Sequence, residues 1–144
     1  MIENIMEQIR QMNYAVNSTV SAYAIWAKKR GLSYNSLIML YYLEENERCT
    51  QTQICEAMQL PKSTVHSILQ DFIQKGYMEL EAKSENKKEK SICLTGKGKK
   101  FVMTVLEELH AMEARAMEKL GKDCEQFIRT NILFCEIFSR ELND

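Results

Sequence analysis

The stretch from Leu60 to Tyr77, LPKSTVHSILQDFIQKGY, most constrains what this chain can fold into. Pro61 suits the first position of a helix, and Gly76 suits a left-handed stop. The apolar side chains between them recur every three or four positions: Val65, Ile68, Leu69, Phe72 and Ile73. This spacing predicts one amphipathic helix over about 61–75.

The opposite face of this expected helix is polar but mostly uncharged. It carries Lys62, Ser63, His66, Ser67, Gln70 and Gln74. Such side chains both donate and accept hydrogen bonds, as the reading of base edges in a DNA major groove requires. A plain amphipathic surface helix would also fit, and the stretch by itself leaves both interpretations open.

Composition and charge narrow the class of protein. The 144 residues include one proline and five glycines, which favours long helices in one domain or one core with an appendage. No apolar run approaches a membrane span, and the acidic N-terminus is unlike a secretory signal. Five cysteines without close pairs fit a reducing cytoplasm. Residues 60–100 carry a net charge of +4 between acidic ends, as a nucleic-acid-binding element would.

The segments before Leu60 are predicted to be helical. Residues 2 to about 29 have the periodicity of a long helix that Gly31 ends, with Lys28–Arg30 as a basic last turn. Ser33 can cap a helix to about Asn46, and Thr50 with Gln53 forms a capping box for a short third helix. Residues 54–68 then have helix-turn-helix spacing, with Cys55 at the close crossing and Gln59 where such turns often have glycine.

A wing is predicted directly after this pair of helices. Residues 77–82 alternate between apolar and polar, and 91–94 form a possible partner strand. Lys83 to Lys90 between them contains no apolar residue. We therefore expect a mainly α fold with a minor β component, in which residues 32–100 form a winged helix-turn-helix with its wing at about 77–94.

The chain ends are expected to be helical and apolar on one side. Thr95 can cap a helix that Gly121 ends, and Asp123 with Gln126 can cap a last helix. Long helices at both ends cannot all be buried on a small core, so we expect 1–31 and 101–144 to form a helical dimerisation bundle. A bundle within one chain is the alternative.

Taken in order, these segments resemble the multiple-antibiotic-resistance regulator (MarR) family of bacterial transcription factors. The resemblance rests on four places: Leu32-Ser33 with Leu40 and Leu43; Gln53-Ile54-Cys55 to Leu60, followed by Lys62-Ser63-Thr64-Val65; Lys75-Gly76-Tyr77; and Leu94-Thr95-Gly96-Lys97-Gly98. It covers essentially the whole chain. It implies a winged helix-turn-helix homodimer that binds a pseudo-palindromic operator, as a repressor, with recognition helices roughly 34 Å apart.

Two departures from the family pattern concern which sequence is read. Asn86-Lys87-Lys88 stands where the family has Asp-x-Arg at the wing tip, so the planar fork of arginine is absent there. Ser67 stands where the recognition helix often has arginine, and His66 replaces a small residue. We expect base contacts from Ser63, Thr64, His66, Ser67 and Gln70, and phosphate or minor-groove contacts from Lys62, Lys87, Lys88 and Lys90.

The sequence offers no catalytic set, so an enzyme is not expected. The G-x-S-x-G, H-E-x-x-H and C-x-x-C patterns are absent. His110 with Glu107 and Glu113 could form a metal site, but a solvated helix face is the preferred interpretation, and neither metal nor cofactor is expected. The five cysteines are interpreted as small buried hydrophobic residues rather than redox sensors.

Two further expectations concern partners. Family members often respond to small aromatic or amphipathic compounds, and Trp26, Tyr34, Met39, Tyr41 and Met103 could line such a pocket, although plain core is the more common role of these residue types. The alternative function is a winged-helix module that binds protein without reading DNA. The apolar-free segment Lys83 to Lys90 argues against it, because protein-binding surfaces expose apolar side chains.

Overall fold

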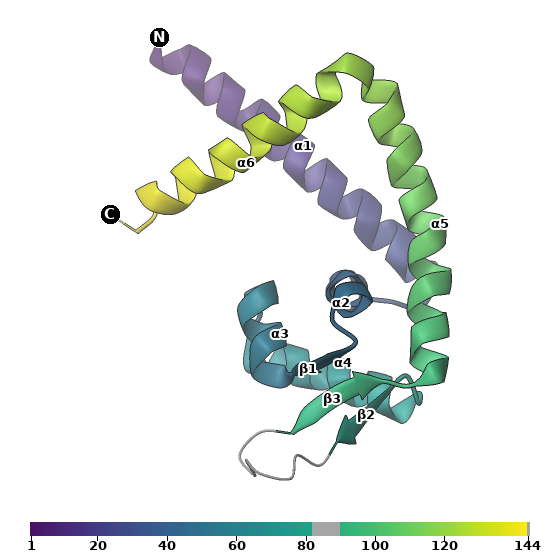
Figure 1. Ribbon diagram of the computed structural model, residues 1–144. Coiled ribbons are helices and arrows are strands. Elements are labelled where there is room, and N and C mark those ends of the chain that lie inside the picture. Colours follow the sequence, from purple (N-terminus) through teal and green to yellow (C-terminus); the bar gives the residue numbers. More distant parts are fainter. Residues whose placement is uncertain (82–89, 144) are drawn as a thin grey trace. The chain divides into compact units, whose positions relative to one another are not determined.

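The computed structural model describes residues 1–81 and 90–143 (Figure 1). The chain divides into two compact units, Met1–Met103 and Thr104–Asp144. Its helices and strands follow in the order α1 (Ile2–Lys28), α2 (Tyr34–Glu45), β1 (Arg48–Thr50), α3 (Gln51–Met58), α4 (Lys62–Gln74), β2 (Met78–Glu81), β3 (Ser91–Leu94), α5 (Gly96–Leu120), a 3₁₀ turn η1 (Gly121–Asp123) and α6 (Cys124–Glu141). The expected mainly helical fold with a small wing is confirmed.

The core of the first unit lies where α2, α3 and α4 meet the sheet. Its fully or almost fully buried side chains include Leu37, Leu40 and Leu43 of α2, Ile54 of α3, Val65, Leu69 and Phe72 of α4, and Met78 of β2. These are the residues whose spacing predicted the apolar faces. The helix α1 joins this core only at its C-terminal end, where Ala27 is buried.

Glycine ends both α1 and α4 with the same motif. Gly31 and Gly76 have φ values of 71° and 76°, which a residue without Cβ adopts freely. The N–H of Leu32 donates to the carbonyl of Ala27 at 3.0 Å, and that of Tyr77 to Phe72 at 2.8 Å. These are the hydrogen bonds of a Schellman cap, so both predicted stops are confirmed.

The predicted caps are confirmed at α2 and α3. Ser33 Oγ accepts from the N–H of Ser36 at 3.0 Å. In the capping box of α3, Gln53 N–H donates to Thr50 Oγ1 at 3.2 Å, and Thr50 N–H donates to Gln53 Oε1 at 2.9 Å. Each bond gives a partner to a backbone N–H group at the start of a helix, where no carbonyl of the preceding turn is available.

Two predicted helix starts are wrong in detail. Pro61 is the N-cap of α4 rather than its first helical residue, with ψ at 144°, so the helix begins at Lys62. Asp123 makes no side-chain cap bond at α6. The preceding 3₁₀ turn holds its backbone in the right-handed helical region, whereas a capping side chain needs an extended backbone.

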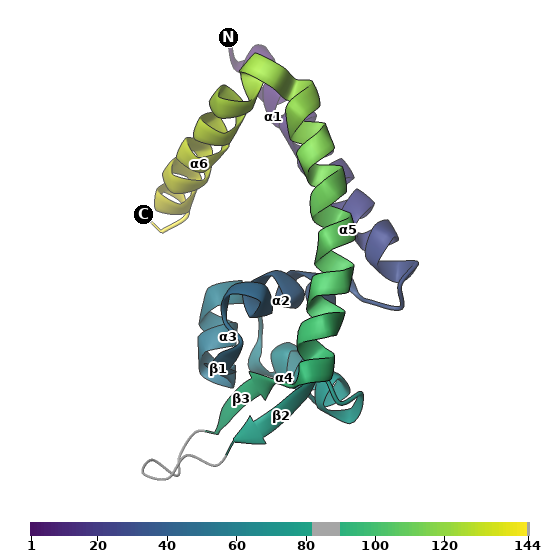
Figure 2. The ribbon, with the colours of Figure 1, turned by 45° about the vertical axis from the view of Figure 1, so that its right-hand side comes forward.

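The sheet has three antiparallel strands in the order β1-β3-β2, so β3 is central. Figure 2 shows β2 and β3 side by side. The hairpin pairs Met78 with Leu94 and Leu80 with Ile92, as the alternation predicted. The strand β1 was not predicted. It pairs Cys49 with Ile92 and leads directly into α3.

Thr95 ties the end of the wing to the end of α4. Its Oγ1 donates to the carbonyl of Gly76 at 2.6 Å and accepts from the N–H of Gly98 at 3.0 Å, which confirms it as the cap of α5. Beside it, the rings of Tyr77 and Phe101 stack with centroids 4.1 Å apart. The end of α4, the strands β2 and β3 and the start of α5 are therefore joined to one another at this point.

The second unit contains the remainder of α5, the 3₁₀ turn and α6. Gly121, with a φ of 58°, ends α5 as predicted. The helix α6 exposes many large apolar side chains, among them Phe127, Phe134 and Phe138. In the part of the chain that the structure describes, no helix is long and apolar enough to cross a membrane.

Candidate nucleic-acid interface

The helix α4 separates a buried apolar face from an exposed polar face. Val65, Ile68, Leu69 and Phe72 are buried. The polar residues Lys62, Ser63, His66, Ser67 and Gln70 are exposed, and Thr64 is half-buried. From Lys62 to Gln70 the helix carries no carboxylate, and the first acidic residue, Asp71, pairs with Lys75 at 2.8 Å. The front of the helix is therefore free of negative charge.

The turn between α3 and α4 has the predicted helix-turn-helix form. Gln59 adopts a left-handed backbone with φ 50° and ψ 41°, the conformation for which glycine is usual. Ile54 is fully buried, whereas Cys55, Met58 and Leu60 are half-buried. The expected close crossing at Cys55 is therefore less tightly enclosed than its small size suggested.

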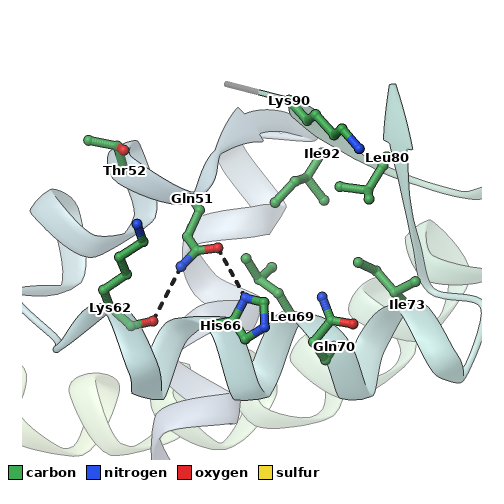
Figure 3. A pocket seen from close by; sticks show the side chains of 10 residues that line it. All are labelled: Gln51, Thr52, Lys62, His66, Leu69, Gln70, Ile73, Leu80, Lys90 and Ile92. Atoms are coloured by element: carbon green, nitrogen blue, oxygen red, sulfur yellow. Dashed lines mark hydrogen bonds between the residues drawn. The ribbon is translucent and has the colours of Figure 1, made fainter. Parts of the chain in front are cut away.

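A groove of about 460 Å³ lies between α4, the start of α3 and the wing strands (Figure 3). Its apolar lining consists of Leu69 and Ile73 of α4 with Leu80 and Ile92 of the sheet. Its polar lining consists of Gln51, Thr52, Lys62, His66, Gln70 and Lys90. The wing and the helix thus share one concave surface, to which two lysines contribute.

A second groove, of about 360 Å³, lies along the other flank of α4. It is lined by Ser33 and Asn35 at the start of α2 and by Ser63, Thr64, Ser67 and Ile68 of α4. Every side chain here except Ile68 is a small, uncharged hydrogen-bonding group. Because the N-terminus of α2 opens onto this groove, backbone N–H groups and the helix dipole favour an anion there.

The predicted DNA contacts are therefore distributed over two flanks of one helix. Lys62, His66, Gln70 and Lys90 line the first groove, and Ser63, Thr64 and Ser67 line the second. Sequence reasoning missed Gln51 and Asn35, because only the folded chain brings the starts of α3 and α2 beside α4. Lys87 and Lys88 lie outside the described residues.

Negative charge gathers on another surface of the wing. A groove of about 370 Å³ is lined by Glu47, Glu79 and Glu81, with Arg48, Cys93, Leu94 and Lys99. Arg48 pairs with Glu81 at 2.9 Å and Lys99 with Glu47 at 2.6 Å. Since side chains alternate along β2, Glu79 and Glu81 lie on the opposite face of the sheet from Leu80. Leu80 lines the groove that contains Lys62 and Lys90, so the carboxylates of Glu79 and Glu81 lie on the face of the sheet away from that groove.

The cysteines differ from one another in exposure. All five are free, but only Cys49 and Cys93 are buried, while Cys55 and Cys124 are half-buried and Cys135 is exposed. The expectation that all five are buried is therefore wrong, most clearly for Cys135 on α6. Burial, followed by the charge of Cys93, raises the pKa of the Cys49 thiol to about 11. Burial is also the first cause that raises the pKa of Cys93, ahead of Glu81 and Glu79.

The residues expected to line an effector pocket have different environments. Met39 is completely buried, whereas Met103 is 66% exposed. Trp26, Tyr34 and Tyr41 are half-buried. The Arg30 guanidinium lies over the Trp26 ring at 3.6 Å, and among the described side chains Trp26 Nε1 is buried without a hydrogen-bond partner.

His110 has a structural partner on its own helix. Its Nδ1 lies 2.8 Å from Glu113 Oε2, one turn away. Over residues 1–81 and 90–143, no group of three or more His, Cys, Asp or Glu side chains could hold a metal ion.

A helix-turn-helix followed by a strand hairpin defines the winged helix-turn-helix class, and comparison with known proteins refines this assignment. Residues 30–89 match the model of the MarR family. A MarR family regulator from Neisseria meningitidis has a TM-score of 0.78 at 20% identity, over 94% of this chain and 96% of that chain. A MarR from Staphylococcus aureus in complex with salicylate and kanamycin has a TM-score of 0.74 at 17% identity, over 96% of this chain and 93% of that chain. The structure of overoxidized AbfR bound to DNA has a TM-score of 0.71 at 18% identity, over 96% of this chain and 99% of that chain. No curated protein matches.

This family model is that of winged helix-turn-helix transcriptional regulators, and its match is confined to residues 30–89. The matched residues include α2, β1, α3, α4 and β2, and the solved structures have the same fold over nearly the whole chain. The family is one of DNA-binding regulators and not of enzymes, as the sequence indicated.

Proposed function

We propose that this chain is a repressor that binds a pseudo-palindromic DNA operator as a homodimer. The observation that supports this most strongly is the exposed face of α4. It is polar, free of carboxylates from Lys62 to Gln70, and flanked on both sides by grooves with hydrogen-bonding walls. A face of this kind fits the major groove, where base edges offer donors, acceptors and thymine methyl groups.

Each group of side chains takes a distinct role in this proposal. Ser63, Thr64, His66, Ser67 and Gln70 contact base edges, and Lys62, Lys87, Lys88 and Lys90 contact phosphates or the minor groove. Without arginine on the reading face, specificity rests on short polar contacts and on DNA shape. The positive charge comes from lysines at the rim and in the wing.

The apolar faces of the terminal helices support the homodimer. In α1 the exposed large apolar side chains include Ile2, Ile5, Met6 and Ile9, and in α6 Phe127, Phe134 and Phe138. Helix faces that expose several large apolar side chains mark surfaces that bind another protein. In a two-fold dimer the same faces of two copies meet, which would set two recognition helices roughly 34 Å apart. In this assignment, 1–31 and 101–144 form the dimerisation region and 32–100 the DNA-binding domain.

A small aromatic or amphipathic effector would release the operator in this proposal. The support is the solved S. aureus relative in complex with salicylate, together with the half-buried Trp26, Tyr34 and Tyr41 of this chain. Met39 and Met103 complete the proposed lining.

The proposed location is the cytoplasm. Five free cysteines agree with it, because a reducing compartment keeps thiols from forming disulfides.

Selection of bound fragments from the source genome, followed by titration with the selected duplex, tests the proposal. We expect one recurring half-site and an affinity that falls steeply with salt. Lys62→Ala should reduce the salt slope by about one unit, because one phosphate contact is lost. Lys119→Ala, which removes an exposed lysine of α5, is the matched control and should leave the slope unchanged.

The same titration distinguishes the alternative function. A protein-binding module would select no recurring sequence and would bind duplex DNA weakly. The salt dependence of that weak affinity would not change in Lys62→Ala. That result would refute the regulator proposal.

A further inference from the structure

Gln51, the first residue of α3, connects two points of the recognition helix (Figure 3). Its side-chain Nε2 donates to the backbone carbonyl of Lys62 at 3.3 Å. Its Oε1 lies 3.5 Å from His66 Nδ1. The second contact is at the long end of the hydrogen-bond range, so it orients an exposed ring rather than enclosing it.

The contact of Gln51 with Lys62 determines which atom donates and which accepts in its contact with His66. A backbone carbonyl can only accept, so the amide group of Gln51 must turn its NH₂ toward Lys62. Its Oε1, which can only accept, then faces His66. The ring nitrogen at this contact must therefore carry the hydrogen, and Nδ1–H is the form of the neutral imidazole that fits.

The hydrogen on Nδ1 leaves a lone pair on Nε2. Which ring nitrogen is protonated is set by the hydrogen bond that the other one makes. The groove residues beside His66 include the donors Lys62 and Lys90 but no carboxylate. Within the described part of this groove, nothing acidic competes with Gln51 as an acceptor for a ring N–H. Since His66 is exposed, its Nε2 acceptor is available to a ligand.

We propose that Gln51 is a positioning residue that makes His66 Nε2 a hydrogen-bond acceptor, and that His66 therefore reads an exocyclic amino group in the DNA major groove. This inference rests on the proposed DNA-binding function. The major-groove amino donors are adenine N6 and cytosine N4. Guanine and thymine present the keto oxygens O6 and O4 instead, which an acceptor cannot contact favourably.

The inference has a definite consequence for the operator. Every base pair has one amino base, so His66 does not distinguish A·T from G·C. It distinguishes the strand on which the amino base lies. We expect one position in each half-site to require adenine or cytosine on one strand and to reject guanine and thymine there.

The first test is spectroscopic and needs no DNA. In a two-bond ¹H–¹⁵N correlation spectrum of the neutral ring, wild-type His66 should show Nδ1 protonated and Nε2 unprotonated. The chain has two histidines, so His66→Gln assigns the signals. In Gln51→Ala the Nε2–H form should become populated, while Gln74→Ala, which removes an exposed glutamine near the end of α4, should change nothing. A wild-type ring protonated on Nε2 would overturn the inference, whether or not DNA binds.

The second test is the base preference at the assigned position. Exchange of the amino base for a keto base should weaken wild-type binding about fivefold or more. His66→Ala and Gln51→Ala should bring the amino-to-keto ratio of affinities close to one, and Gln74→Ala should retain the wild-type ratio. Full preference in Gln51→Ala would refute the positioning role. Specific binding with no such position would refute base reading by His66, and absence of all specific binding would refute the proposed function while the ring assignment stands.

Discussion

Gly98, near the start of α5, is required by the close approach of another backbone. A Cβ atom built at Gly98 would lie 1.9 Å from the carbonyl oxygen of Tyr77, a distance that no side chain can occupy. Gly98→Ala must therefore displace the junction between α4, the wing and α5. We expect a loss of about 3 kcal/mol in the free energy of unfolding, measured by urea denaturation with circular dichroism.

The matched control is two residues away. A Cβ at Gly96 meets nothing within 4 Å, and its φ is not positive. Gly96→Ala should be neutral or stabilise by up to about 1 kcal/mol, because alanine restricts the unfolded chain. Equal stability of the two variants would contradict the tight contact at Gly98.

The rate at which each cysteine thiol reacts should follow its exposure and its pKa. The pKa of Cys49, raised to about 11 by burial, leaves little thiolate at neutral pH, and the pKa of Cys93 is also raised. Cys135, which is exposed, should react first with Ellman's reagent. Modification of Cys49 should accelerate with pH up to about 11, as its thiolate fraction grows. Fast labelling of Cys49 at pH 7 in the folded protein would contradict its burial.

The thiolate of Cys49 also links stability to pH. Its folded pKa lies above the ordinary thiol value, so the unfolded chain loses this proton first as pH rises. The free energy of unfolding should therefore fall between about pH 9 and pH 11. Cys49→Ser should reduce that alkaline slope, although the hydroxyl itself costs stability in a buried position.

Among the elements, the turn between α3 and α4 contains a local strain that one substitution can relieve. Gln59 is the one residue other than glycine with a positive φ among the described residues. Gln59→Gly should stabilise the protein by about 0.5 kcal/mol. Glycine adopts the left-handed backbone without strain, and this gain exceeds the cost of the extra conformational entropy that glycine gives the unfolded chain. Gln74→Gly in the last turn of α4 should instead destabilise by about 1 kcal/mol, and thermal unfolding of the pair checks the contrast.

The sequence was most informative about elements whose signals are local. Apolar spacing predicted the buried faces of α2 and α4, and Ser33, Thr50, Gly31 and Gly76 marked real helix ends. The strand β1 gave no such signal. Its three residues are too few for periodicity, and it forms because β3, far along the chain, offers a free edge. Asp123 was misjudged because a 3₁₀ turn, which depends on the left-handed Gly121, precedes α6.

At the scale of the whole molecule, the candidate site was predictable only in part. The polar face of α4 is a property of one helix, and its spacing revealed it. The two grooves beside it depend on which residues of α2, α3 and the sheet come near, so Gln51 and Asn35 could not be identified from spacing. The burial of cysteines likewise depends on tertiary packing, which is why Cys135 differs from Cys49.

The last prediction concerns assembly, which the proposed function requires. On α6, Phe127, Phe134 and Phe138 recur at seven and four residues and so share one face, and the rings of Phe134 and Phe138 stack at 5.6 Å. These side chains are 50%, 41% and 51% exposed. A partner copy that covers them would remove a large apolar area from water, and burial of one phenylalanine is worth about 2 kcal/mol.

Phe138→Glu should therefore shift the dimer to monomers. In a two-fold interface the buried charge occurs twice, so the dimer dissociation constant should rise by about two orders of magnitude or more, as measured by analytical ultracentrifugation. Glu136→Lys changes an exposed charge on the opposite side of α6 and should leave the dimer intact. The monomer should keep weak half-site binding and lose the tight binding of a full operator, because one recognition helix no longer positions the other. A Phe138→Glu protein that stays dimeric and binds the full operator tightly would show that α6 does not hold the two copies together.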